Sequence, residues 1–161
     1  MAQECGIIMC MKEDQLHIMR HSLAHIMAAA IQQLWPEAKF GVGPIIDDGF
    51  YYDIDLGGAK ISEEKFPKIE KEIRSIINRG DSFEKSNKPI DKAIRWAKDN
   101  NQPYKEELLN DLKRSGTTIS KDLDTNEIGL ATDGESAISS VIFYTNGDFI
   151  DLCRVPHLAN T

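Results

Sequence analysis

Apolar residues recur every three or four positions over residues 13–35, which predicts one amphipathic helix that ends at Pro36. We expect the apolar stripe of this helix to face the core, and the opposite polar side either to face solvent or to open on a cleft. Residues 1–12 are expected to form an N-terminal lead, either a strand or a tag-like segment. The stripe consists of Leu16, Met19, Leu23, Ile26, Met27, Ala30, Ile31 and Leu34.

The rest of the chain mixes hairpins with shorter helices. Asp48-Gly49 predicts a hairpin within residues 39–55, and Asn146-Gly147 predicts a second one that joins residues 137–144 to 148–152. Further helices are predicted over residues 62–79, from Pro89 to the break at 100–103, and over 104–113. Residues 115–136 are polar and rich in Gly, Asp and Thr, and are either an excursion loop or a weak hairpin.

Helices and hairpins that do not alternate strictly predict an α+β fold, with helices packed on a largely antiparallel sheet. The last strand would deliver Asp151 and Cys153 to a sheet end. Pro156 keeps Val155 extended, so we expect His157 to lie in a turn rather than in a helix. A cleft is expected between the polar face of the first long helix and this C-terminal hairpin turn.

Composition and charge narrow the classes of protein. The 161 residues are 41% hydrophobic and 28% charged, which is typical of a globular protein, and the sequence has no apolar run long enough to span a membrane. The net charge of -7 argues against a bulk electrostatic grip on nucleic acid, so such a partner has to be held locally or by another domain. No Walker-type loop is present, so we expect no ATP site within this chain. The sparse cysteines, Cys5, Cys10 and Cys153, and an N-terminus without a basic signal region favour the cytoplasm.

Two pairs of chemically active residues are each four positions apart. His21 and His25 share one face of the first helix, and Cys153 and His157 repeat the spacing near the end of the chain. A helical histidine pair is ordinarily a polar surface feature. Here both imidazoles lie away from the apolar stripe, near the small Ala28, so the alternative is a reactive cleft with room for a ligand.

Several motifs occur together along the chain. They are His21-Ser22-Leu23-Ala24-His25, Gln33-Leu34-Trp35-Pro36, Gly43-Pro44, Gly49-Phe50-Tyr51-Tyr52-Asp53, and Asp151-Leu152-Cys153-Arg154 with Pro156-His157. In combination they resemble the N-terminal editing domain (N2) of threonyl-tRNA synthetases, a domain family shared with alanyl-tRNA synthetases. The likeness spans residues 17–161. The histidine and cysteine pairs alone would also suit the alanyl branch and free-standing alanyl deacylases, whereas the run from Gly43 to Asp53 selects the threonyl branch.

The resemblance implies that water hydrolyses the ester between wrongly attached serine and the terminal adenosine of threonine tRNA. His21 would position or deprotonate the water, with His25 beside it on the helix. Lys105 matches a lysine that the family uses near the scissile ester, where it would supply positive charge to the oxyanion. The alternative for Lys105 is an ordinary helix-surface lysine.

The resemblance also assigns the opposite wall of the site. Cys153 and His157 would line it, Cys153 as a polar contact or a water partner rather than as a covalent nucleophile. Asp151 would bind the seryl ammonium. Tyr144 would contact the terminal ribose or adenine, and Arg154 belongs to the same substrate-binding set.

The metal content is the open chemical question. His21, His25, Cys153 and His157 form a set with plausible zinc spacing, and the alanyl relatives use theirs in that way. The threonyl branch resembles a version that works with water and side chains. We therefore expect editing to need no metal or other cofactor, and ATP to be used only in the missing aminoacylation domain. Two rival functions are a zinc-structural module and a non-catalytic tRNA-docking module.

Two departures from the family pattern matter. Val155 replaces the glycine of the family's Cys-Arg-Gly-Pro-His, and a backbone φ above zero would be strained there. The family's ubiquitin-like, aminoacylation and anticodon-binding domains are missing, which suggests a fragment of a longer synthetase or, as the alternative, a free-standing editor.

The predicted editing domain covers residues 13–161, with 60–115 as a candidate helical subdomain. The implied partners are the serine-carrying acceptor end of threonine tRNA and the remainder of the synthetase, with no membrane and no DNA.

Overall fold

The computed structural model describes residues 2–115 and 138–161, and the side chains within residues 15–114 and 138–161. The segment predicted as an excursion loop or weak hairpin, 115–136, lies outside the described residues except for its first residue. The side chains of Cys5 and Cys10 also lie outside them.

The described residues form an α+β fold, as the sequence predicts. None of the helices in this part of the chain is long and apolar enough to cross a membrane. The helices are α1 (Ala2–Leu34), the short 3-10 helix η1 (Glu63–Lys65), α2 (Phe66–Arg79), α3 (Ile90–Asp99) and α4 (Pro103–Ser115). The strands are β1 (Lys39–Phe40), β2 (Ile45–Ile46), β3 (Gly49–Phe50), β4 (Ile54–Asp55), β5 (Phe83–Pro89), β6 (Ser140–Asn146) and β7 (Phe149–Leu152).

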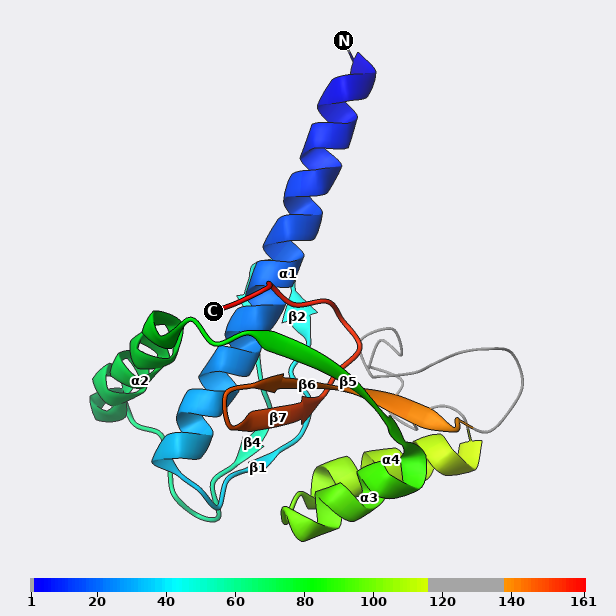
Figure 1. The fold of residues 1–161 in the computed structure, drawn as a ribbon. Helices are drawn as coiled ribbons and strands as arrows, with labels where there is room; N and C mark the ends of the chain where they lie inside the picture. The colour runs from blue at the N-terminus through cyan, green and yellow to red at the C-terminus, as the bar shows by residue number, and fades with distance from the viewer. Residues whose placement is uncertain (1, 116–137) are drawn as a thin grey trace.

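The central sheet is antiparallel, with strand order β5-β6-β7. The helices α3 and α4 lie together on one side of it, and the long α1 runs past the other side with α2 beside it (Figure 1). Two smaller antiparallel pairs, β1 with β4 and β2 with β3, arise from the segment that follows α1. Both predicted hairpins are present, but each turn lies one residue away from the predicted pair. The turn between β2 and β3 is Asp47-Asp48, and the turn between β6 and β7 is Gly147-Asp148.

Side chains alternate between the two faces of β7, and this alternation divides the core. Ile150 and Leu152 pack with α3 and α4, whereas Phe149 packs with α1. Asp151 shares the face of Phe149 and is directly opposite Tyr144 on β6. Asp151 and Tyr144 therefore lie on the face of the sheet that packs against the C-terminal half of α1.

The apolar pattern of α1 misidentifies the buried face over residues 16–25. His21 and His25 are each only 4% exposed, and Ser22 is fully buried. The polar face is the inner one because the C-terminal residues pack on it, and the small Ser22 lets the backbone of Leu158 come within hydrogen-bond distance of it. In contrast, three members of the predicted stripe are exposed: Leu16 (39%), Met19 (49%) and Leu23 (37%).

The start of α1 also differs from the sequence-based expectation. The segment expected to be a strand or a tag-like lead is helical from Ala2 onward, continuous with the rest of α1. The apolar residues of α2 are only partly buried: Ile69 and Ile76 are buried, whereas Phe66 and Ile77 are exposed.

The segment between α1 and α2 places an aromatic ring against a glycine. A Cβ atom built on Gly43 would lie 2.4 Å from the ring of Tyr52, closer than real side chains approach. The backbone of Tyr52's neighbour Asp53 is held by Val42 and Gly41 across the same segment. Gly43 therefore provides the space that Tyr52 occupies.

We predict that Gly43→Ala will destabilise the chain by about 1–3 kcal/mol, because the added methyl must push the Tyr52 ring aside. Urea unfolding followed by circular dichroism measures this change. Gly49→Ala is the matched control, since nothing lies within 4 Å of a Cβ atom at Gly49. Equal stability of the two variants would contradict the close packing of Tyr52 on Gly43.

Candidate active site

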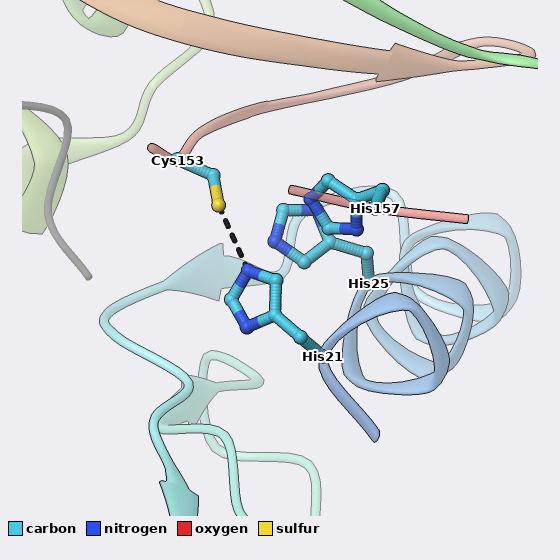
Figure 2. Close-up of side chains that lie close together, drawn as sticks. All are labelled: His21, His25, Cys153 and His157. Atoms are coloured by element: carbon cyan, nitrogen blue, oxygen red, sulfur yellow. Dashed lines mark hydrogen bonds between the residues drawn. The ribbon is translucent and has the colours of Figure 1, made fainter. Parts of the chain in front are cut away.

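Two segments from opposite ends of the chain bring imidazole and thiol groups together. His21 and His25 project from successive turns of α1, and Cys153 and His157 lie on the segment that follows β7 (Figure 2). The Nε2 atom of His21 is 2.8 Å from the Sγ atom of Cys153. The ring of His157 lies 4.3 Å from that of His25 and 4.7 Å from that of His21, centroid to centroid.

The C-terminal segment is held in place at several points. The amide of Cys153 donates to the carbonyl of Ile142 on β6, and the amide of Leu158 donates to the Oγ atom of Ser22. The His157 ring stacks on Phe83 at 4.6 Å and meets Tyr144 edge-on at 4.4 Å. These contacts fix the position of the imidazole relative to α1.

Beside the imidazoles lies a buried ion pair. The ammonium of Lys105 on α4 is 2.8 Å from Oδ1 of Asp151, and each residue is 3% exposed. Asp151 Oδ1 also accepts from the amide of Leu152 at 2.8 Å, and the hydroxyl of Tyr52 donates to Oδ2. Nε2 of His25 is 3.9 Å from Oδ2. The carboxylate thus has three donors, which offsets the cost of burying its charge.

Burial keeps the imidazoles neutral. It lowers the pKa of His21 to about 4, and the charge of Asp151 opposes the shift only partly. Burial, followed by the neighbouring His25 and His21, lowers the pKa of His157 to about 2. The pKa of His25 lies well below its ordinary value for the same reason, with His21 and Lys105 adding to the effect. At neutral pH all three rings can therefore accept a hydrogen bond through a lone pair.

Two ring nitrogens have no partner among the described residues. They are Nδ1 of His21 and Nε2 of His157, and both are buried. Buried polar atoms are normally hydrogen-bonded to protein or to an ordered water. The cluster therefore has the polar atoms to hold a small polar molecule between the two segments.

The same cluster can be tested for its fit to zinc. One ligand atom from each of His21, His25, Cys153 and His157 lies within 4.8 Å of the others, and the set of donors is one that zinc prefers. Nitrogen and sulfur bound to one tetrahedral zinc are about 3.6 Å apart, given the usual bond lengths. The shorter His21–Cys153 distance of 2.8 Å is that of a hydrogen bond. The four side chains are of the types that bind zinc. In this structure, however, the His21 nitrogen and the Cys153 sulfur are as close as hydrogen-bonded atoms, closer than two ligands of one zinc ion.

Within the described residues, α1 and the C-terminal segment are in direct contact through the His21–Cys153 and Ser22–Leu158 hydrogen bonds. The alternative that the imidazoles face solvent is wrong, because both helical histidines are buried against that segment. Lys105 and Asp151 do line a cavity of about 180 Å³ on the side of α3, together with Trp96, Asn100 and Gln102, among other residues. Open space thus adjoins the ion pair, whereas the imidazoles are packed.

The structure brings seven of the eight predicted site residues together. Lys105 is buried, which excludes the alternative of a helix-surface lysine. Arg154 is half-buried on the C-terminal segment and makes no ion pair with the others within the described residues. Val155 is unstrained, since Asn101 is the only non-glycine residue with a positive φ in the described part of the chain. The seven are His21, His25, Lys105, Tyr144, Asp151, Cys153 and His157.

Sequence reasoning missed two residues of this site. Tyr52 bonds to Asp151, and its pKa is raised well above the ordinary value by burial and by that carboxylate. Ser22 joins α1 to the backbone and ring of the C-terminal segment. Both residues stood inside the motifs quoted above, but spacing alone carried no signal of what they contact.

The chain is similar to one segment of much longer proteins. Over 92% of its length it is 40% identical to a threonine–tRNA ligase from Desulfosudis oleivorans, of which it covers 19%. Over 98% of its length it is 39% identical to a threonine–tRNA ligase from Desulforapulum autotrophicum, of which it covers 21%. A threonine–tRNA ligase from Clostridium acetobutylicum is 40% identical over 92% of the chain. The chain thus spans about a fifth of the length of these curated relatives. No family model matches it.

We predict that the chain loses stability as the pH falls from 6.5 towards about 4. The folded-state pKa of His21 is about 4, against 6.5 for an ordinary histidine, so the unfolded chain takes up protons first. The stability that comes from neutral imidazoles is therefore complete above pH 6.5 and is lost on acidification. Urea unfolding at several pH values between 6.5 and about 4 measures the free energy of unfolding. His21→Gln should flatten the decline, and an equally steep decline in that variant would contradict the assignment.

Proposed function

We propose that this chain is an editing domain of a threonine–tRNA ligase, hydrolysing the ester between wrongly attached serine and the terminal adenosine of tRNA. The similarity to a segment of threonine–tRNA ligases supports this proposal. The observation that carries it is the buried Lys105–Asp151 pair beside three neutral imidazoles and a thiol. Buried charges are costly for stability, and residues with strongly shifted pKa values are concentrated at reactive sites.

The need for such a reaction follows from the size of the two amino acids. Serine lacks only one methyl group of threonine, and one methyl in a pocket is worth about 1–3 kcal/mol of discrimination. A threonine–tRNA ligase therefore needs a second site that removes serine. In this proposal the remainder of the synthetase and the tRNA are the partners, residues 13–161 are the editing domain, and residues 60–115 are its helical subdomain.

Asp151 is the proposed acceptor for the seryl ammonium. Its carboxylate is already bonded to Lys105, Tyr52 and the amide of Leu152, so an arriving ammonium competes with Lys105. Two cations on one buried carboxylate repel each other. The substrate thus releases Lys105, and the freed ammonium stabilises the oxyanion that forms on the ester.

His21 is the proposed partner of the attacking water. With a pKa of about 4 it is a weak base, so its main contribution is to orient the water through a lone pair. The water oxygen adds to the ester carbon, the carbonyl electron pair moves to oxygen, and the water proton passes to the imidazole. Collapse breaks the bond to the ribose oxygen, which takes up the proton. Tyr144 and Arg154 are the proposed contacts to the terminal adenosine.

A zinc-structural module is the second candidate, and the donor set of His21, His25, Cys153 and His157 favours it. In that case the four side chains hold α1 and the C-terminal segment together through the ion. The editing proposal and this candidate differ in what happens when metal is removed, because a structural zinc domain loses its fold with the ion.

We predict that the purified chain will release serine from mischarged seryl-tRNA faster than buffer does, and will spare threonyl-tRNA. His21→Ala should lower the rate by about 100-fold, because the variant loses both the group that orients the water and the acceptor of its proton. The measurement is the loss of radiolabelled serine from tRNA. Tyr104→Phe is the control, since the Tyr104 hydroxyl bonds to the exposed Asp55 rather than to the cluster. No acceleration by the wild-type chain would refute the proposal.

We also predict that dialysis against a strong chelator leaves the Tm of the chain unchanged. Hydrogen bonds and ring contacts already join the two segments, so the fold does not depend on an ion. Differential scanning calorimetry measures the Tm, and metal analysis measures the zinc content of the chain. One zinc per chain together with unfolding in chelator would favour the structural module, and Cys153→Ser should then lower the zinc content.

A further inference from the structure

Ser22 lies between the two helical histidines and is completely buried. Its Oγ atom has three polar neighbours. They are the carbonyl of Ile18 at 2.9 Å, the amide of Leu158 at 2.9 Å, and Nδ1 of His157 at 3.3 Å. One small side chain thus joins α1 to the C-terminal segment and touches an imidazole of the cluster.

The three neighbours decide where the hydroxyl hydrogen points. The carbonyl of Ile18 can only accept a hydrogen bond, and the amide of Leu158 can only donate one. The single hydroxyl hydrogen therefore goes to Ile18, at the shorter of the two contacts that can accept it. The remaining contact requires a hydrogen on Nδ1 of His157, donated to the Ser22 oxygen.

The other ring nitrogen of His157 gives an independent reason for the same tautomer. Nε2 is buried and has no partner within the described residues. A hydrogen there would be a buried donor without an acceptor, which is the less tolerated kind of unsatisfied group. A bare lone pair at the same place can accept a hydrogen bond from a small molecule such as water.

We infer that Ser22 is a positioning residue, whose hydroxyl holds His157 as the tautomer protonated at Nδ1 and so keeps the Nε2 lone pair available inside the imidazole cluster. This inference rests on the proposed function only in its consequence: the lone pair is a second acceptor for the attacking water, beside that of His21. Phe83 and Tyr144 fix the plane of the His157 ring, and the bond to Ser22 selects the edge that faces α1.

The direct test is the tautomer of His157, read from long-range proton–nitrogen NMR spectra of the ¹⁵N-labelled chain at neutral pH. We expect the wild-type chain to show His157 protonated at Nδ1. In Ser22→Ala we expect the signal to shift towards the Nε2-protonated form, and Ser22→Thr, which keeps the hydroxyl, should restore the wild-type pattern. Assignment of the ring comes from the loss of its signals in His157→Gln.

A merely structural role of Ser22 predicts a different result. Thr161→Val is the matched control, because it removes another bond that holds the C-terminal segment, from Thr161 Oγ1 to the carbonyl of Ile76, without touching His157. Both variants loosen this segment, but only Ser22→Ala should change the tautomer. In seryl-tRNA hydrolysis, Ser22→Ala should lower kcat about tenfold with little change in KM, the equivalent of one lost hydrogen bond.

Each outcome decides the inference. A wild-type chain with His157 protonated at Nε2 would overturn it, even if Ser22→Ala failed to fold. It would also be overturned if Ser22→Ala kept the wild-type tautomer, or if Thr161→Val changed it equally. The NMR result does not depend on hydrolysis, so a chain that fails to release serine but shows the expected tautomers would refute the proposed function alone.

Discussion

The arrangement of the site depends on the ion pair and hydrogen bonds that the buried carboxylate of Asp151 forms. This carboxylate draws the ammonium of Lys105 from α4, the hydroxyl of Tyr52 from the segment after β3, and the amide of Leu152 from its own strand. Removing one partner from a buried ion pair typically costs about 3–5 kcal/mol, because a charge is left without compensation. Three elements that are distant in sequence are therefore held to one point of the sheet.

The imidazole cluster next to this carboxylate obeys a different constraint. Its rings are packed against each other and against aromatic side chains, so burial outweighs the attraction of Asp151 and the rings stay neutral. Charge is thus confined to Asp151 and Lys105, while lone pairs are provided by the neutral histidines. A site with separate charged and neutral halves can bind an ammonium on one side and orient a water on the other.

The features that depend on neighbouring residues in the sequence were predictable, whereas those that depend on distant contacts were not. The β6–β7 turn and the break after α3 are set by backbone preferences of the residues involved. The break lies where expected, and the turn lies one residue later than expected, at Gly147-Asp148. The spacing of His21 and His25 placed both on one helical face. The inner face of α1 was not predictable from periodicity, because Leu16 and Met19 continue the apolar stripe but are exposed.

The sequence by itself determined which chemical groups are available and which of them lie on a common helix face or strand end. Tertiary structure alone decided that the polar face of α1 is the buried one, that Lys105 is an ion-pair partner, and that Tyr52 and Ser22 belong to the site. The physical reason is that burial of a polar group depends on the partners that satisfy it. Those partners come from segments as many as 136 positions away, which no local pattern can specify.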